Sequence, residues 1–356
     1  MNDYKKQLED ILDLAIKKDA TDIHISVKRP PIFRIAGRLT PSDEHKAFTG
    51  KDTQELAFTL LSEERKEQFL KQKDIDLSFT YKDKARFRIN IYYQLSQISI
   101  ALRMIPNKVR TVEELSLPSI TYQFTKAPQG FFLVVGPSGQ GKSAALAAMI
   151  DDINHNRYDH IVTIEDPIEH VFKPDKCIID QREVGEDVQN FHRGLREVFR
   201  QDPDVIMIGE MRDPETISSA VTAAETGHLV LATLHTNTAA QTINRIIDSF
   251  PPFQQNQIRV QLASTILGIL SRRLLPCLKG SVINAVEVMV ANSAIRNLIR
   301  EGKIHQIDMI IETSSEEGMI SLNRSLAHLV KKKLISMENA EMHSTNASEL
   351  KMLLKK

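Results

Sequence analysis

Tryptophan is absent from this chain of 356 residues, and cysteine occurs only twice, at Cys177 and Cys277. The two cysteines lie far apart in the sequence and form no CxxC pair, so they cannot by themselves supply a four-ligand zinc site. Such sparse cysteine usage favours a protein of a reducing compartment, and we expect the cytosol.

Long hydrophobic runs and an excess of charge of one sign are also missing. No stretch approaches the ~18 consecutive apolar residues of a membrane-spanning helix, and the N-terminal residues lack the apolar region of a signal peptide. Basic and acidic residues number 46 each, so no overall field attracts nucleic acid or an anionic membrane. We therefore expect a cytoplasmic protein; if it works at a membrane, a partner must hold it there.

Residues 1–105 have the pattern of a small α+β domain. Tyr4 to Ile16 present one apolar helical face. Helices are also predicted at 52–61 and 63–71, with short strands at 22–27, 32–35, 77–81, 87–92 and 98–104. In the last two strands apolar and polar side chains alternate, which is typical of half-buried antiparallel strands.

The pattern changes after residues 106–119, whose prolines and polar residues indicate a linker. Within residues 120–292 the predicted strands are continuous apolar runs, at 131–135, 161–164, 205–208 and 229–232. Helical segments separate these runs, an order typical of a mostly parallel sheet covered by helices. The remaining residues, 293–356, have a helical and charged pattern, so the fold class is α/β.

A phosphate-binding loop joins the first of these strands to the following helix. Its sequence fits the P-loop pattern G-x-x-x-x-G-K-[ST]. Glycines allow the loop its unusual dihedral angles, and backbone N–H groups at the helix N-terminus attract phosphate. We expect Lys142 to reach the β- and γ-phosphates of ATP and Ser143 to bind Mg²⁺. The candidate nucleotide contacts are Gly136, Pro137, Ser138, Gly139, Gln140, Gly141, Lys142, Ser143 and Ala144.

Acidic residues follow two of the predicted strands, at the carboxyl edge of the sheet where ligands bind. Glu165 is expected near Mg²⁺ and the γ-phosphate, with a helix cap or turn as the structural alternative. Glu210 follows Gly209, which stands where many P-loop ATPases have a metal-binding aspartate. We expect Glu210 to polarise the attacking water, although an ion pair with Arg212 would also account for it.

Two histidines bracket the strand predicted at 229–232. His228 precedes the strand and His235 follows it, so only one of them can lie near the γ-phosphate. His235, at the carboxyl end, is the catalytic candidate, and His228 is carried as a candidate nucleotide contact. A structural role fits either histidine equally well, and neither belongs to a cluster with metal-ligand spacing.

These four elements, in this order, resemble the ATPase superfamily of type II and type IV secretion systems. Its Walker A, Asp-box, Walker B and His-box motifs correspond in turn to residues 136–143, 163–170, 205–213 and 227–237. The segments that resemble its N-terminal PAS-like domain are 22–26, 31–35 and 85–90. Residues 294–301 resemble the signature helix of its PilT-like branch, the pilus retraction ATPases. Two distant cysteines cannot supply the four-cysteine zinc module that is usual in assembly and type II secretion relatives.

The resemblance implies a homo-hexameric ring that binds ATP between the PAS-like domain and a RecA-like ATPase domain. In such rings arginines of the N-terminal domain approach the phosphates, and the implied partner is an inner-membrane platform protein of the pilus. Arg88 and Arg103 are candidates for catalysis and Arg86 for nucleotide contact, because all three fall on polar strand faces. Arginine suits this task since it stays charged and forms forked contacts to phosphate. Ordinary solvated surface arginines are the alternative.

Two positions depart from the family pattern. Ala144 stands where threonine is common, which removes a possible hydroxyl contact to the α-phosphate. Gln140 replaces a usual serine or threonine, and its side chain is expected to point away from the phosphates. Neither change removes a catalytic group.

The sequence therefore predicts a motor ATPase that hydrolyses MgATP to power type IV pilus retraction and twitching motility. A type IV secretion ATPase or an accessory pilus ATPase would share the same chemistry. A nucleic-acid motor is disfavoured by the balanced charge and by the lack of interleaved basic and aromatic segments. A nucleotide-binding module without turnover is disfavoured by the retained Lys142, Ser143, Glu165 and Glu210.

Overall fold

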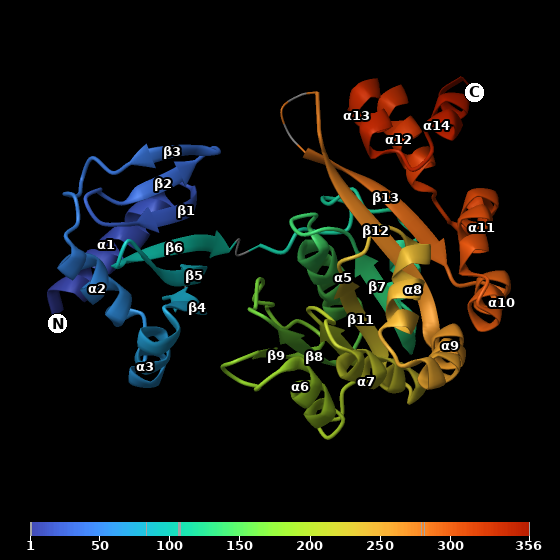
Figure 1. The fold of residues 1–356 in the computed structure, drawn as a ribbon, viewed down its shortest axis with the longest axis horizontal. Coiled ribbons are helices and arrows are strands. Elements are labelled where there is room, and N and C mark those ends of the chain that lie inside the picture. The colour runs from blue at the N-terminus through green and yellow to red at the C-terminus, as the bar shows by residue number, and fades with distance from the viewer. Residues whose placement is uncertain (1, 83, 106–107, 279, 281, 356) are drawn as a thin grey trace. The chain divides into compact units, whose positions relative to one another are not determined.

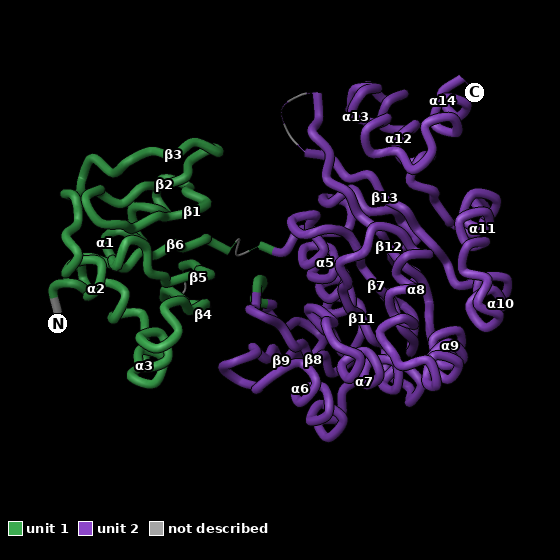
Figure 2. The backbone as a smooth tube through the Cα atoms, in the orientation of Figure 1, with its two compact units in different colours: residues 1–108, 169–171 green, residues 109–168, 172–356 purple. Residues whose placement is uncertain are grey.

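The computed structural model describes residues 2–82, 84–105, 108–278, 280 and 282–355. The chain forms two compact units, a smaller one of residues 1–108 with 169–171 and a larger one of residues 109–168 with 172–356 (Figure 2). Pro106 and Asn107 of the predicted linker lie outside the described residues. Val112, Leu115 and Leu117, in the remainder of that linker, are buried in a hydrophobic cluster of the larger unit. This part of the predicted linker is therefore packed rather than free.

The smaller unit contains a six-stranded antiparallel sheet in the order β3-β2-β1-β6-β5-β4 (Figure 1). Its strands are β1 (Ala20–Ile25), β2 (Ile32–Ile35), β3 (Arg38–Pro41), β4 (Asp74–Tyr81), β5 (Ala85–Gln94) and β6 (Gln97–Ile105). Its helices are α1 (Asn2–Lys17), α2 (Gly50–Thr59) and α3 (Glu63–Gln72). The predicted α+β pattern is confirmed, and the structure adds β3, whose four residues are all exposed.

The larger unit contains a seven-stranded sheet in the order β13-β12-β7-β11-β10-β8-β9. Its strands are β7 (Gly130–Val135), β8 (His160–Glu165), β9 (Ile178–Glu183), β10 (Val205–Ile208), β11 (Leu229–Leu234), β12 (Ile266–Pro276) and β13 (Val282–Val290). Neighbouring strands pair in parallel except β12 and β13, which pair antiparallel. The predicted mostly parallel sheet is confirmed.

Helices cover this sheet and extend beyond it (Figure 1). They are α4 (Thr121–Thr125), α5 (Lys142–Asn156), α6 (Phe191–Val198), α7 (Pro214–Glu225), α8 (Ala239–Asp248), α9 (Pro252–Thr265), α10 (Ser293–Glu301), α11 (Ile307–Thr313), α12 (Leu322–Lys331), α13 (Met337–His343) and α14 (Ala347–Lys355). The predicted helical pattern after residue 293 is confirmed. Among the described residues, no helix is long and apolar enough to cross a membrane.

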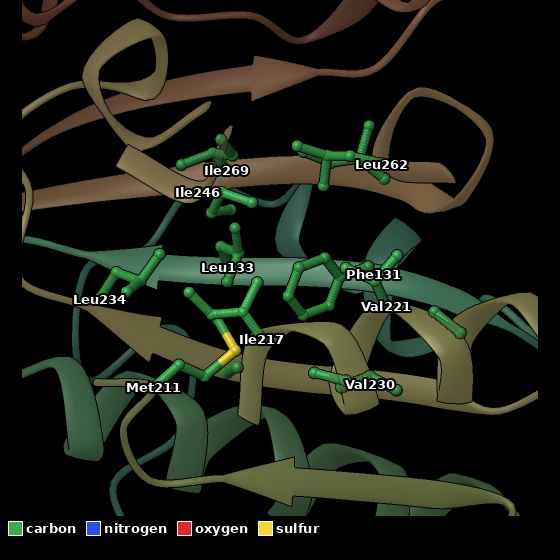
Figure 3. Packing of buried hydrophobic residues seen from close by; sticks show 14 of the residues in the cluster. Phe131, Leu133, Met211, Ile217, Val221, Val230, Leu234, Ile246, Leu262 and Ile269 are labelled. Carbon is green, nitrogen blue, oxygen red and sulfur yellow. The ribbon is translucent and has the colours of Figure 1, made fainter. Parts of the chain in front are cut away.

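Strand β7, in the interior of the sheet, is buried along its whole length because helices pack on both of its faces. Phe131 and Leu133 point into a cluster with Ile217 of α7 and Ile246 of α8 (Figure 3). The intervening residues point to the opposite face, where Phe132 packs in a cluster with α5. This two-sided burial explains the unbroken apolar run in the sequence. It also fixes the carboxyl end of β7, from which the P-loop leaves.

Candidate active site

The P-loop leaves β7 at Gly136 and enters α5 at Lys142. Gly136, Gly139 and Gly141 have φ angles of 149°, 76° and 71°, values that glycine adopts without the strain of a side chain. A Cβ atom on Gly136 would lie 2.7 Å from the carbonyl oxygen of Arg272, so no larger residue fits there. The N-terminal backbone of α5 then presents its N–H groups at the end of the loop.

Lys142 is buried, and its ammonium lies across the loop that precedes it. Its Nζ donates hydrogen bonds to the carbonyl oxygens of Gly136 at 2.9 Å and Pro137 at 3.0 Å. The same Nζ lies 3.3 Å from Nδ1 of His235, at the end of β11. The lysine therefore connects the P-loop to the loop that follows β11.

His235 continues this connection to Glu210. Its Nε2 lies 3.2 Å from Oε1 of Glu210. Because a lysine ammonium can only donate, Nδ1 is the acceptor in its contact with Lys142. The contacts place a carboxylate, an imidazole and an ammonium in one row.

Glu210 is held from its other side by Arg212, whose Nη2 donates to Oε2 at 2.8 Å. Burial acts to raise the pKa of Glu210, while the hydrogen bond and charge of Arg212 act to lower it. The neighbouring His235 and Lys142 act in the same direction as Arg212, and the pKa lies below the usual value for glutamate. The carboxylate is therefore ionised at neutral pH, as a base must be.

Glu165, the last residue of β8, is buried, and its carboxylate is oriented by neighbouring side chains. Its Oε1 accepts hydrogen bonds from Thr163 Oγ1 at 2.7 Å and from Gln181 Nε2 at 3.2 Å. Gly209, after β10, lies against it, since a Cβ there would be 3.3 Å from both Glu165 Cα and the carbonyl oxygen of Ile164. Glycine at position 209 thus lets the ends of β8 and β10 approach closely, and an aspartate side chain would crowd Glu165.

His228 lies at the opposite end of β11 from His235. β11 runs parallel to β7 with Leu229 beside Gly130 and Leu234 beside Val135, so His228 precedes the strand by the end remote from the P-loop. The six residues of β11 span five residue steps, so the two ends of the strand lie roughly 17 Å apart. The His228 ring contacts the carbonyl oxygen of Ala223 at 2.9 Å and the edge of the Phe199 ring. At this position His228 contacts Ala223 and Phe199, and its nucleotide contact stays a prediction.

The three arginine candidates belong to the smaller unit, where they lie on the polar face of its sheet. Arg88 and Arg103 are directly opposite each other on β5 and β6. Arg103 Nε donates to Oδ1 of Asp22 at 2.9 Å, and Arg34 Nε lies 3.5 Å from Oδ2 of the same carboxylate. Burial acts to raise the pKa of Asp22, but the hydrogen bonds from Arg103 and Thr21 and the charges of Arg103 and Arg34 together outweigh it, and the pKa is lowered. The aspartate therefore stays ionised between two guanidinium groups.

Arg86 is held differently, by two hydroxyl groups of β4. Its Nη2 donates to Ser78 Oγ at 2.6 Å and its Nη1 to Thr80 Oγ1 at 3.1 Å. These bonds direct the side chain of Arg86 along β4, whereas Arg88 is exposed. Of the three candidates, Arg88 and Arg103 form the pair on adjacent strands.

The remaining P-loop candidates have distinct environments. Ser143 is exposed in the first turn of α5, where its hydroxyl is accessible to a ligand. Gln140 is turned toward β12, where its Oε1 accepts a hydrogen bond from the backbone N–H of Leu274. This is the predicted direction, away from the interior of the loop. Gln140 therefore holds the P-loop against β12, and its side chain does not point into the loop.

Sequence reasoning missed the hairpin of β12 and β13, which supports the loop after β11. Ser271 Oγ donates to the carbonyl oxygen of Asn237 at 2.7 Å, and Glu287 accepts from the N–H of Ala239 at 2.7 Å. Both bonds hold the chain just after His235. Burial raises the pKa of Glu287 to about 7. The sequence signal that could have indicated Ser271 and Glu287 is their polar character within the otherwise apolar run of residues 266–290.

A glycine-rich loop between a buried parallel strand and a helix, with a lysine and two strand-end carboxylates, defines the chain as a P-loop ATPase. Residues 2–350 match the family described as Type II/IV secretion system protein. The chain belongs to this family.

Comparison with individual relatives shows which members of the family this chain resembles. The type IV pilus retraction ATPase PilT of Pseudomonas aeruginosa is 41% identical over 337 residues, which cover 94% of this chain and 96% of that protein. The type IV pilus ATPase PilU of the same organism is 35% identical over 350 residues, with 98% and 91% coverage. A crystal structure of the pilus retraction motor PilT with bound ADP has a TM-score of 0.91 and 43% identity, with 97% and 98% coverage.

Proposed function

We propose that this chain is the motor ATPase that retracts a type IV pilus and so powers twitching motility. The observation that carries the proposal is the similarity to PilT along nearly the whole length of both chains. The segment 294–301, which resembles the retraction signature, forms α10. Asn292 caps its start and Gly302 ends it, while Ile295 and Ile299 bury its apolar side in the core.

In this proposal the P-loop binds the phosphates of ATP. Lys142 keeps its two bonds to the carbonyl oxygens of the loop, and the third proton of its ammonium turns from His235 to a phosphate oxygen. Mg²⁺ prefers oxygen ligands and retains several waters, so the exposed Ser143 hydroxyl and the buried carboxylate of Glu165 suit it directly or through water. When bound, the ion neutralises charge on the β- and γ-phosphates. Ser143 and Glu165 are therefore the residues that would hold it.

Glu210 acts as the general base in this proposal. It is ionised, and Arg212 and His235 each hold one of its oxygens, which keeps the carboxylate in a fixed orientation toward an attacking water. His235 also contacts Lys142, so a change at the γ-phosphate can reach Glu210 through one imidazole ring. Glu210 and Lys142 then respond together to a change at the γ-phosphate.

The same proposal places the chain in a homo-hexamer at the cytoplasmic face of the inner membrane, acting on the pilus platform protein. Arg88 and Arg103 would complete the phosphate site within the ring. Their position on an exposed sheet face and the fixed orientation of Arg103 by Asp22 support this role. Domain closure around the nucleotide would then drive the movement of subunits.

A deletion strain complemented with the wild-type chain or with Glu210→Gln tests the function. We expect loss of twitching and an excess of surface pili in the deletion strain, rescue by the wild-type chain and no rescue by the variant. Loss of pili would show an assembly role instead. Unchanged twitching would favour an accessory role, which the similarity to PilU also supports.

A further inference from the structure

Strand β12 continues past the end of β7 and lies against the P-loop. Ser271 of β12 is paired with Val135, the last residue of β7. The next residue, Arg272, therefore lies beside Gly136, and its carbonyl oxygen is the atom that a Cβ on Gly136 would meet at 2.7 Å. The backbone of Arg272 thus leaves no room for a side chain at Gly136, the first residue of the loop.

The side chain of Arg272 reaches the other end of the same loop. It is 1% exposed, and its Nη1 donates to the carbonyl oxygen of Gly141, the N-cap residue of α5. A Cβ on Gly141 would lie 3.2 Å from Nη1 of this guanidinium. One residue therefore contacts the first and the last glycine of the P-loop.

The charge on Arg272 has no carboxylate to balance it. Burial and the positive charge of Arg110 lower its pKa to about 10, which leaves the guanidinium protonated at neutral pH. Within the described ranges, no aspartate or glutamate forms an ion pair with it. A buried unpaired cation is costly, and here it adds positive potential directly beneath a loop that binds phosphate.

Arg272 is also bonded away from the loop, to strand β13. Its Nη2 donates to Oδ1 of Asn284 at 2.8 Å, and Nδ2 of Asn284 donates to the carbonyl oxygen of Leu115. Leu115 is buried, and its own N–H donates to the carbonyl oxygen of Thr111 at 3.0 Å. The chain from Thr111 to Leu117 lies close to the start of the larger unit, which begins at residue 109.

We propose that Arg272 is a positioning residue of the nucleotide site, and that Arg272 and Asn284 couple the P-loop to residues 111–117. A nucleotide that moves Gly141 must move or break the guanidinium contact, and the same guanidinium holds Asn284 against Leu115. This inference rests on the ATPase site described above. It is tested by ADP binding, so it fails separately from the retraction role.

The adjacent arginine provides a matched control. Arg273 lies on the opposite face of β12 and donates through Nη1 to the carbonyl oxygen of His343 at 2.8 Å, remote from the P-loop. We expect Arg272→Gln to raise the Kd for ADP by about tenfold, the effect of one charge-assisted hydrogen bond. Arg273→Gln should stay within twofold of wild type. An equal loss in both variants, or wild-type affinity in Arg272→Gln, would overturn the positioning role.

Arg272→Lys separates charge from geometry if the glutamine variant does not fold. A lysine keeps the positive charge but lacks the planar fork that bonds Gly141 and Asn284 together. We expect a folded variant, by circular dichroism, whose Kd for ADP is raised by at least threefold. Wild-type affinity in Arg272→Lys would show that charge alone matters and would overturn the proposed positioning.

The coupling itself is tested by hydrogen exchange of the full chain with and without ADP. In the wild type we expect ADP to change the exchange of the Leu115 and Leu117 amides, which donate within this segment. Asn284→Asp keeps an acceptor for Arg272 but loses the donor to Leu115. It should abolish the ADP-dependent change while weakening ADP binding less than Arg272→Gln does. A wild type without the change, or a variant that retains it, would refute the coupling.

Discussion

The two sheets of this molecule handle charge in different ways. In the larger unit apolar clusters cover both faces of the sheet, and the two carboxyl groups of the site, Glu165 and Glu210, stand after strand ends, where each accepts bonds from neighbours. In the smaller unit helices cover one face, and the other carries Arg88 and Arg103 toward solvent. The first arrangement makes a site that is largely preformed. The second makes a surface whose charges acquire a role only when something binds to it.

Lys142 offers the most severe test of the preformed site. Lys142→Ala removes the donor that connects Gly136, Pro137 and His235, and with it the ammonium that meets the phosphates. We expect ATP turnover to fall by at least about 10³-fold, measured as phosphate release by the full chain. The exposed Lys126 in the same unit provides a control, and Lys126→Ala should keep wild-type turnover. Turnover within tenfold of wild type in Lys142→Ala would contradict the assigned role.

Glu210→Gln separates chemistry from binding. Glutamine has the same shape but cannot accept a proton, so we expect kcat to fall by about 10²- to 10⁴-fold while the Kd for ADP changes by less than threefold. Isothermal titration and phosphate release on the same preparation measure both quantities. Glu215→Gln, at an exposed position in the first turn of α7, is the matched control. A kcat near that of the control would exclude Glu210 as the base.

The arginines of the smaller unit test the other side of the comparison. Arg103 and Arg34 share the carboxylate of Asp22, but only Arg103 faces Arg88 on the adjacent strand. If Arg103 completes a phosphate site in a ring, Arg103→Gln should lower kcat by about 10²-fold. Arg34→Gln should remain within twofold. Equal effects in steady-state assays of the two variants would mean that the arginines only stabilise Asp22.

The preformed half of the site was predictable because its signals are local. Continuous apolar runs mark buried parallel strands, and the residues directly after them meet at one edge of the sheet. This rule predicts Lys142, Glu165, Glu210 and His235 at one edge of the sheet. His228 precedes the same strand and lies at the opposite end of it.

The residues of β12 and β13 that support the site could not be predicted by the same reasoning. Arg272 and Glu287 lie within strands, where charged residues normally indicate an exposed face or a loop. Their burial depends on backbone groups far away in the sequence, such as Gly141 for Arg272 and Ala239 for Glu287. No pattern within one segment reports a partner 131 positions away. Residues of this kind become visible only when the strand order is known.

A carboxyl-to-amide change in each unit should alter stability in opposite directions. Glu287 is buried, and its pKa in the folded chain is about 7 against 4.5 in the unfolded chain. The pH-dependent cost of this shift is therefore absent below pH 4.5, grows up to pH 7 and is constant above it. Glu287→Gln should raise the free energy of unfolding by about 2 kcal/mol at pH 8 and leave it unchanged at pH 4.

Asp13 of the smaller unit is the counterpart. Hydrogen bonds from Lys84 and Tyr81 lower the pKa of this exposed carboxyl, so it stabilises the fold above its unfolded pKa of 3.8 and loses that effect on acidification. Asp13→Asn should therefore destabilise slightly at pH 8. Urea unfolding of both variants at two pH values gives the signs directly. A change in the free energy of unfolding with the same sign for both variants at pH 8 would contradict this prediction. The signs should differ because hydrogen bonds and opposite charge outweigh desolvation at Asp13, whereas desolvation outweighs them at Glu287.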